Sequence, residues 1–306
     1  IPKRDWSSDV CSSDLSDLMV MDIGENLPEI VTYSKSDKQA IRKLSCPGML
    51  HDPWWYEPAA FSGSIASCEV PTILAIDPSA GGSDELAWAI VKAYAGNYFL
   101  VESGGRKGGL SEELGMELAL LAKKHYVNGA IIESNFGGLE VWAQALKPFF
   151  SRIGHPVTFE PFRSNTKKEV RIIDTLAPVV QTHKVIIDRR VIEKDNEIAE
   201  NALEENDVCY SLFYQYTRIN YERGCLLHDD RLDVFAMAVQ WFQEQAAQRQ
   251  DQISEARRVE LLEAEIGDEN GYMLMNIDRL ALGMTLEQAR KAEASAGISR
   301  GSWLSQ

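Results

Sequence analysis

The chain has 306 residues, of which 45% are hydrophobic, and a formal net charge of -15. This length and hydrophobic content suit one large or two modest domains with a real core. The acidic balance argues against a passive coat on nucleic acid, because such proteins present excess Lys and Arg to phosphate. A metal-dependent enzyme stays possible, since bound cations neutralise carboxylates locally.

Membrane, secretion and disulfide signals do not stand out in this sequence. No stretch approaches the roughly 20 apolar residues of a membrane span, and the N-terminus lacks the basic-then-apolar order of a secretory signal. The five cysteines form neither a CxxC pair nor the dense, even spacing of a disulfide scaffold. We therefore expect an intracellular protein without a zinc site.

The first 69 residues show no long amphipathic period. Residues 1–15 hold a Ser/Asp near-repeat, RDWSSDVCSSDL, and back-translation of Asp5 to Leu15 reproduces a sequencing-library adapter. We leave residues 1–15 out of fold reasoning and expect the chain to be a fragment of a longer gene product. Residues 16–69 include a stretch rich in Pro, Gly and aromatic residues, and we interpret them as a connector from a preceding domain.

The pattern changes near residue 70, and the main domain is expected to extend over residues 70–248. Three β-prone runs separated by Gly-rich or Gly-Asn turns predict an antiparallel meander over residues 71–105. Helices and strands then alternate: helix 110–126, strand 129–134, helix 138–150, strand 157–162, helix 167–180, strand 184–188, helix 189–206 and helix 228–248. This order predicts an α/β fold with a mixed sheet of five or more strands, flanked by helices.

Two segments have less regular patterns. The aromatic stretch 210–221 is interpreted as a strand or hairpin with one buried face, and stacking on nucleic-acid bases is its alternative. Residues 249–306 form a polar tail with a weaker helix at 285–294, where Thr285 and Gln288 fit a capping box.

Acidic residues stand where the predicted elements begin and end. Asp77 and Glu133 each end a predicted strand and precede a Gly-rich turn. Carboxylates at the ends of neighbouring strands point into one shared crevice. Asp230 and Asp233 are three apart at the start of the last helix, so they project from one side of its first turn, and Asp229 can share a side with Asp233.

Each of these acids also has a purely structural explanation. Asp77 before Pro-Ser can shape a turn, Glu133 can cap the next helix, and Asp229 or Asp230 can be the N-cap. The combination favours two-metal phosphoryl transfer instead. Two hard cations about 4 Å apart need several oxygen ligands, activate a water and stabilise the leaving oxygen.

Basic residues lie between the second and third acidic motifs. Arg163, Lys167, Lys168 and Arg171 stand just before and within the helix 167–180, and Lys168 shares a side with Arg171. A groove that binds a phosphate backbone needs a basic rim, so these four residues are candidates for contact with phosphate. The alternative is a solvated helix start.

Weaker candidates surround these motifs. Arg106 and Lys107 stand in a Gly-rich loop and could contact phosphate. His228 could assist proton transfer, although a His beside carboxylates more often orients one of them. Asp84 and Glu85 could form an outer shell to the metals or simply occupy a polar hairpin tip.

Taken together, these motifs resemble the C-terminal nuclease domain of the large terminase subunit of tailed bacteriophages, most closely the podovirus type. The resemblance covers most of residues 16–247, and the motifs IIESNFGG and HDDRLD, in this order, are its specific part. It implies an RNase H-like, RuvC-like fold that cuts concatemeric viral DNA with two divalent ions, Mg²⁺ or Mn²⁺. By position it implies that Asp77, Glu133 and Asp230 are catalytic. Asp233 matches the second acid of a DxxDA helix, in which Val234 replaces the usual Ala, and Asp229 is a cap or an outer-shell metal ligand.

The resemblance also implies partners and a place of action. Double-stranded DNA would be the substrate, and the portal protein, the procapsid and the small terminase subunit would be partners in the cytoplasm of an infected bacterium. Family members carry an N-terminal ATPase, but this chain has no G-x-x-x-x-G-K-[ST] loop, and GGRKGG at 104–109 has the wrong spacing. We therefore expect DNA hydrolysis without an ATP site. A RuvC-like Holliday-junction resolvase and a non-catalytic portal-docking module are the alternatives.

Overall fold

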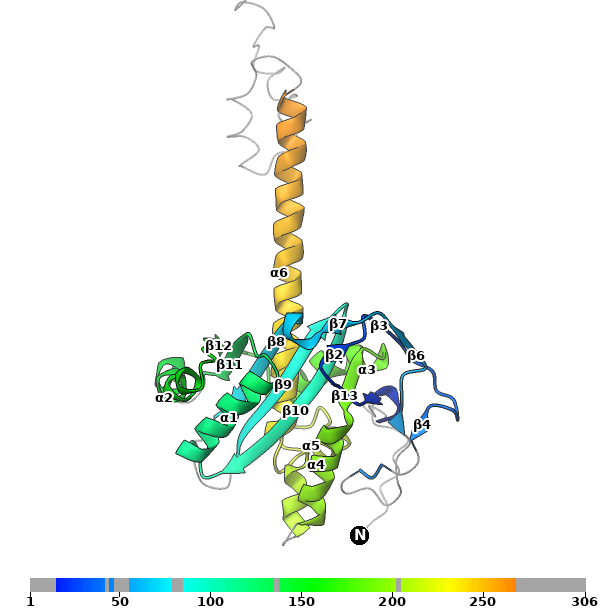
Figure 1. The fold of residues 1–306 in the computed structure, drawn as a ribbon, viewed down its shortest axis with the longest axis vertical. Helices are drawn as coiled ribbons and strands as arrows, with labels where there is room; N and C mark the ends of the chain where they lie inside the picture. Colours follow the sequence, from blue (N-terminus) through cyan, green and yellow to red (C-terminus); the bar gives the residue numbers. More distant parts are fainter. Residues whose placement is uncertain are drawn as a thin grey trace, which may run out of the picture. The chain divides into compact units, whose positions relative to one another are not determined.

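Among the residues that the structure describes, nine strands pair in one mixed sheet, in the order β12-β11-β8-β9-β10-β13-β1-β5-β4 (Figure 1). The computed structural model describes residues 15–41, 44–46, 55–78, 85–134, 138–201 and 205–267. The chain forms two compact units, Ile1–Glu244 and Gln245–Gln306. The first unit carries the sheet and every candidate site residue. Residues 1–14 of the adapter-like segment, Asp84 and the expected helix 285–294 lie outside the described residues.

The predicted antiparallel meander is confirmed as the centre of the sheet. It consists of β8 (Thr72–Asp77), β9 (Glu85–Tyr94) and β10 (Asn97–Lys107). Next to β8 lie two strands parallel to it, β11 (Gly129–Glu133) and then β12 (Thr158–Phe162). On the other side β13 (Val185–Asp188) runs parallel to β10. A mixed sheet of this connectivity needs helices on both faces, because its central strands are buried on both sides.

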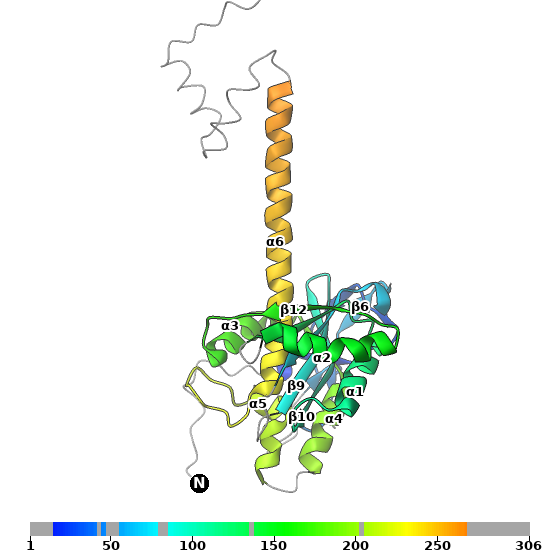
Figure 2. The ribbon, with the colours of Figure 1, turned by 90° about the vertical axis from the view of Figure 1, so that its left-hand side faces the viewer.

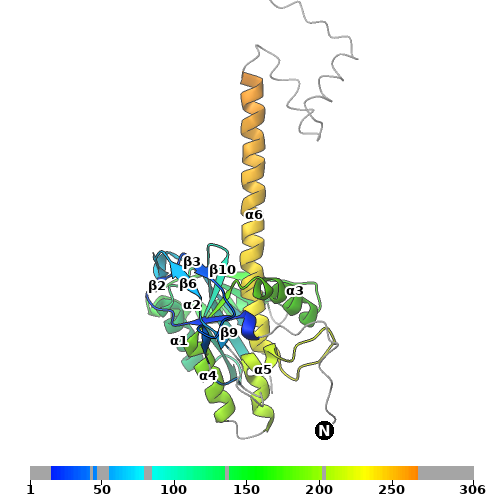
Figure 3. The ribbon, with the colours of Figure 1, turned by 90° about the vertical axis from the view of Figure 1, so that its right-hand side faces the viewer.

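Helices cover both faces of the sheet. They are α1 (Glu112–Lys124), α2 (Gly138–Arg152), α3 (Lys168–Gln181), α4 (Arg189–Glu200), α5 (Leu212–Tyr216) and α6 (Asp230–Gly267). Residues of α1 and α2 share one hydrophobic core with Leu74 and Ile76 of β8. The alternate residues Ile73 and Ala75 face a second core, which α3, α4, α5 and the start of α6 complete. Figures 2 and 3 show α1 and α3 on opposite sides of the strands.

The segment expected to be a connector, residues 16–69, contributes three strands to the sheet. These are β1 (Met19–Met21), which is parallel to β13, then β5 (Trp55–Tyr56) and the edge strand β4 (Ala40–Ile41). Strands of two or three residues are too short to show an alternation of apolar and polar residues, so the sequence did not predict them. The same segment also contains η1 (Leu15–Asp17), η2 (Ser67–Glu69) and the small pairs β2 (Asn26–Leu27) with β7 (Ile65–Ala66) and β3 (Ile30–Thr32) with β6 (Ala60–Ser62). Leu15, the last adapter-like residue, is buried in the core.

The strand or hairpin predicted at 210–221 is wrong. This stretch holds the end of η3 (Glu205–Tyr210) and the short helix α5. Ser211 caps α5, since its side chain accepts from Tyr214 N, and the buried carboxylate of Asp195 accepts from Leu212 N and Phe213 N. These caps satisfy the first amides of the helix and outweigh the β-propensity of its aromatic residues.

The last helix is longer than expected. We predicted it to end near residue 248, whereas α6 continues to Gly267. Within the described part of the chain, no helix is long and apolar enough to cross a membrane.

Candidate active site

The acids predicted from the sequence come from three elements that meet at one edge of the sheet. Asp77 is the last residue of β8 and Glu133 the last residue of β11. Ile76 and Ile132 pair directly in the parallel register, so the two acids that follow them lie side by side. Asp229 precedes α6, and its carbonyl accepts from Asp233 N at 2.9 Å. The first turn of α6 therefore delivers the helical acids to the same edge.

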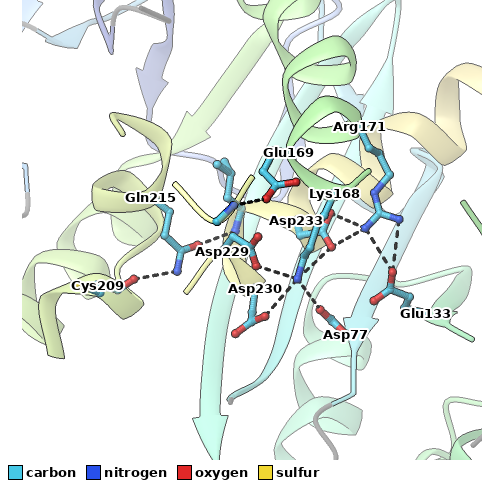
Figure 4. A network of polar contacts seen from close by, with 12 residues as sticks. Asp77, Glu133, Lys168, Glu169, Arg171, Cys209, Gln215, Asp229, Asp230 and Asp233 are labelled. Atoms are coloured by element: carbon cyan, nitrogen blue, oxygen red, sulfur yellow. Dashed lines mark hydrogen bonds and ion pairs between the residues drawn. The ribbon is translucent and has the colours of Figure 1, made fainter. Parts of the chain in front are cut away.

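Carboxylate oxygens of Asp77, Glu133 and Asp233 lie within 4.8 Å of one another. Asp233 is fully buried, whereas Asp77 and Glu133 are each 9% exposed. Asp229 and Asp230 are partly buried beside them, as Figure 4 shows. The structure thus brings together all five acids that the sequence pointed out.

Lys168 occupies the middle of these acids. Its Nζ lies 2.8 Å from Asp229 Oδ1 and 3.2 Å from Asp230 Oδ1. The same Nζ lies 3.4 Å from Asp77 Oδ2 and 3.4 Å from Asp233 Oδ2 (Figure 4). Lys168 is the first residue of α3, and its side chain is 30% exposed. The ammonium group therefore compensates four carboxylates at once.

Arg171, one turn further along α3, joins two of the acids from behind. Its Nη2 donates to Asp233 Oδ2 at 2.6 Å and to Oδ1 at 2.7 Å, and both terminal nitrogens lie 3.3 Å from Glu133 Oε1. The guanidinium also stacks over the ring of Phe162, 5.4 Å from its centroid. Arg171 is buried, so this arrangement is fixed by packing as well as by charge.

The four basic residues predicted to contact phosphate separate into two groups. Arg163 and Lys167 are exposed just before α3. Lys168 and Arg171 share a helical side, as predicted, but this side faces the acids. Sequence spacing shows which residues share a helix face and does not show what that face meets.

Burial and neighbouring charges both shift the pKa values of the cluster. Burial and the neighbouring carboxylates raise the pKa of Asp77 well above its usual range, although Lys168 opposes this. Burial also raises the pKa of Asp233, against the effect of Lys168 and Arg171. Burial alone would lower the pKa of Lys168, but the surrounding carboxylates outweigh burial and raise it. The acids thus share one electrostatic environment, in which each charge depends on the others.

A second, buried ion pair positions the first turn of α6. Arg231 Nε donates to Glu85 Oε2 at 2.9 Å, and Nη2 donates to Glu85 Oε1 at 3.0 Å. On the same turn, Leu232 N donates to the side chain of Gln215 at 3.0 Å. Sequence analysis did not identify Arg231 or Gln215, because their partners lie 146 and 17 residues away.

The remaining candidates have partners of their own. His228 stacks on Tyr210, with ring centroids 3.9 Å apart, and Lys107 Nζ lies 4.1 Å from the centroid of the Tyr210 ring. Arg106 pairs with Glu117 on α1 at 2.7 Å. These contacts place Lys107 and His228 next to the start of α6.

The set of side chains fits hard divalent cations. Five carboxylates and two basic side chains carry a formal charge of -3 when every group is ionised, and Lys168 and Arg171 each contact more than one of these carboxylates. Carboxylate oxygens are the ligands that Mg²⁺ and Mn²⁺ prefer. Positive charge brought to this edge would offset both the burial of Asp77 and the repulsion from its neighbouring carboxylates, which together raise its pKa.

Part of the chain is similar in sequence to known proteins. Residues 76–185 match the family described as Terminase Bacteriophage T7, Ribonuclease H-like domain. The chain is 40% identical over 169 residues to the terminase large subunit of Enterobacteria phage T3. The aligned stretch makes up 55% of this chain and 28% of the T3 protein. The chain therefore spans less than a third of that relative.

Two solved structures of viral nucleases overlap with part of this chain. The large terminase nuclease from thermophilic phage G20c overlaps with a TM-score of 0.39 and 11% identity over 74% of this chain and 96% of that chain. A mutant nuclease domain of the large terminase subunit gp2 of bacterial virus Sf6, with manganese and beta-thujaplicinol, has a TM-score of 0.37 and 13% identity over 55% of this chain and 87% of that chain.

The family match and the mixed sheet flanked by helices confirm the predicted RNase H-like fold. The matched residues 76–185 include Asp77, Glu133, Lys168 and Arg171. Residues 76–185 therefore resemble the ribonuclease H-like domain of a terminase, and the relative from phage T3 is a terminase large subunit.

Proposed function

We propose that this domain is a metal-dependent endonuclease that cuts concatemeric phage DNA during genome packaging. The observation that carries the proposal is the convergence of Asp77, Glu133 and Asp233 oxygens within 4.8 Å, with Asp230 at the same edge. Hydrolysis of a phosphodiester by two metal ions needs such a set of oxygen ligands. The family match and the T3 relative support the same activity.

Each side chain has a distinct part in this proposal. Asp77, Glu133, Asp230 and Asp233 would hold two Mg²⁺ or Mn²⁺ ions, with Asp229 as an outer ligand. When bound, the ions would activate a water and stabilise the leaving oxygen. Arg171 keeps Asp233 and Glu133 at their positions through its hydrogen bonds to both. A buried Asp233 is thereby oriented before any cation or DNA arrives.

The DNA would approach from the side where the acids are exposed. Of the basic residues, Arg163 and Lys167 are exposed next to α3, and these two are the best placed for the phosphate contacts proposed for all four. Such contacts give affinity without reading sequence. We propose double-stranded DNA as the substrate, and the portal protein, procapsid and small terminase subunit as partners in the infected cell.

The proposal is tested with Asp77→Asn and Asp230→Asn in a cleavage assay on linear double-stranded DNA with Mg²⁺ or Mn²⁺. We expect both variants to lose cleavage by at least about a thousandfold, because they remove ligand charge from the reacting site. Asp251→Asn, at an exposed position of α6, is the matched control and should cleave like the unchanged chain.

Two outcomes would contradict parts of the proposal. Cleavage retained in both site variants would show that these acids do not carry the reaction and would favour a non-catalytic docking module. Strong preference for four-way over linear DNA would favour a junction resolvase. Loss of folding, detected by circular dichroism, would mean that the variants report stability, and the assay would then rest on metal binding by the unchanged chain.

A further inference from the structure

The ammonium group of Lys168 lies where carboxylates from two elements converge. Its four contacts, between 2.8 and 3.4 Å, reach Asp77 of β8 and three acids at the start of α6. These are the oxygens that the proposed function assigns to divalent cations. An ammonium ion and a metal ion that share these oxygens would repel each other at a separation of only a few ångströms.

The two basic residues of the cluster differ in how firmly they are held. Arg171 is 5% exposed, donates to both oxygens of Asp233 and stacks on Phe162. Lys168 is the first residue of α3, follows an exposed segment, and its side chain is 30% exposed. Its flexible four-carbon stem can leave the acids without breaking a backbone hydrogen bond of the helix. The ammonium group of Lys168 can thus move away from the acids, whereas the guanidinium group of Arg171 is held in place.

Metal-free acids at this density need a counter-charge. Asp233 is fully buried and Asp77 is 9% exposed, so water screens little of the repulsion between these carboxylates. Lys168 supplies positive charge to four of them, and Arg171 supplies it to Asp233 and Glu133. Without the ammonium group, Asp229 and Asp230 would lose their contact with Lys168 Nζ.

We propose that Lys168 is the built-in counter-cation of the metal-free site, and that a divalent ion must displace its ammonium group to bind. Lys168 is then a positioning residue that holds the acids ready and sets the concentration of metal needed for loading. This inference rests on the proposed function, because it requires that the acids bind metal.

The test is Mn²⁺ binding by the full chain without DNA, measured by electron paramagnetic resonance of free Mn²⁺ at low salt and pH 8. We expect Lys168→Met to bind Mn²⁺ at least about tenfold more tightly than the unchanged chain, because a competing charge a few ångströms away is removed. Lys167→Met removes the same charge from the exposed neighbour and should change the Kd by less than about twofold.

The thermal stability of the metal-free chain provides a second test of the counter-cation role of Lys168. Lys168→Met should lower the Tm without metal and gain a larger Tm shift from Mn²⁺ than the unchanged chain, since bound metal replaces the missing charge. If Lys168→Met does not fold without metal, Lys168→Gln takes its place, because an amide still donates to carboxylates but carries no charge. It should also bind Mn²⁺ more tightly.

The outcomes separate this inference from the proposed function. Unchanged or weaker Mn²⁺ binding in the Lys168 variants, with binding in the unchanged chain intact, would overturn the counter-cation role and leave the nuclease proposal standing. If the unchanged chain binds no Mn²⁺, the proposed function itself fails, and this inference fails with it.

Discussion

At the scale of single residues, the fully buried Asp233 depends most on its neighbours. Arg171 donates to both of its oxygens, and Lys168 lies 3.4 Å from Oδ2. Removing one partner of a buried ion pair leaves an uncompensated charge, which costs more than the pair itself contributes. We therefore expect a substitution of one partner in the Arg171–Asp233 pair to lower the stability of the fold strongly.

We predict that Arg171→Leu lowers the free energy of unfolding of the metal-free chain by about 3–5 kcal/mol. The reason is that Asp233 loses its bidentate partner and Glu133 loses its two contacts with the guanidinium. Urea unfolding measures the change. The exposed Arg163→Leu serves as the control and should change stability by less than about 0.5 kcal/mol.

A double variant distinguishes charge from packing. Asp233→Asn added to Arg171→Leu removes the buried charge, so it should restore part of the lost stability while cleavage stays absent. If the double variant is no more stable than Arg171→Leu, the loss comes from the packing of Arg171 on Phe162 and not from an unpaired carboxylate.

At the scale of elements, the sequence predicted which strands and helix would carry the acids. A strand-end Asp77 and Glu133 and a doubled acid at a helix start are local patterns, so they can be found without a structure. The partners of these acids come from distant parts of the chain. Lys168 and Arg171 were identified, but the direction of their side chains depends on how α3 packs beside α6. The hydrophobic period of a single helix does not predict that packing.

The Arg231–Glu85 pair illustrates the same limit. Glu85 fits against Gly105 of β10, where an added Cβ would lie 2.1 Å from Glu85 Oε2. The absence of a side chain at Gly105 thus leaves room for an ion pair between β9 and α6. Three positions far apart in the sequence combine in this contact, and one sequence alone does not connect them.

A buried lysine connects other elements at the opposite end of β8 from Asp77. Lys92 of β9 is 1% exposed and donates to Ser67 O at 3.1 Å, Thr72 Oγ1 at 2.9 Å and His125 O at 2.6 Å. These partners belong to η2, β8 and the end of α1. Burial lowers the pKa of Lys92 from 10.5 to about 8.

This shift predicts a pH dependence of stability. Between about pH 8 and 10.5 the unfolded chain keeps the Lys92 proton while the folded chain releases it, so the folded state gains stability as the pH rises. We expect the unfolding free energy of the unchanged chain, relative to Lys92→Met, to increase by about 1–3 kcal/mol from pH 7.5 to pH 10. Urea unfolding at both pH values measures it.

The exposed Lys38→Met controls for the general effect of removing a lysine. Its difference from the unchanged chain should not follow the trend of Lys92→Met. A flat difference for Lys92→Met as well would show that its three acceptors hold the ammonium group charged throughout this range.

At the scale of the whole molecule, long and strongly patterned elements were predictable and short ones were not. The meander, the helices α1 to α3 and the strands β11 to β13 follow clear periods in the sequence. Strands β1, β4 and β5 have two or three residues each, and their place in the sheet depends on pairing with β13 and with one another. Tertiary pairing decides such segments, because their own propensity is too weak.

In the proposed function, the acids of β8, β11 and α6 bind the metal ions of a nuclease. Anomalous diffraction from crystals of this chain soaked in Mn²⁺ tests the claim most directly. We predict manganese peaks bound directly by Asp77 and by acids of α6, with the Lys168 ammonium group moved out of the cluster. Manganese absent from these carboxylates, at a concentration that supports DNA cleavage, would contradict the account.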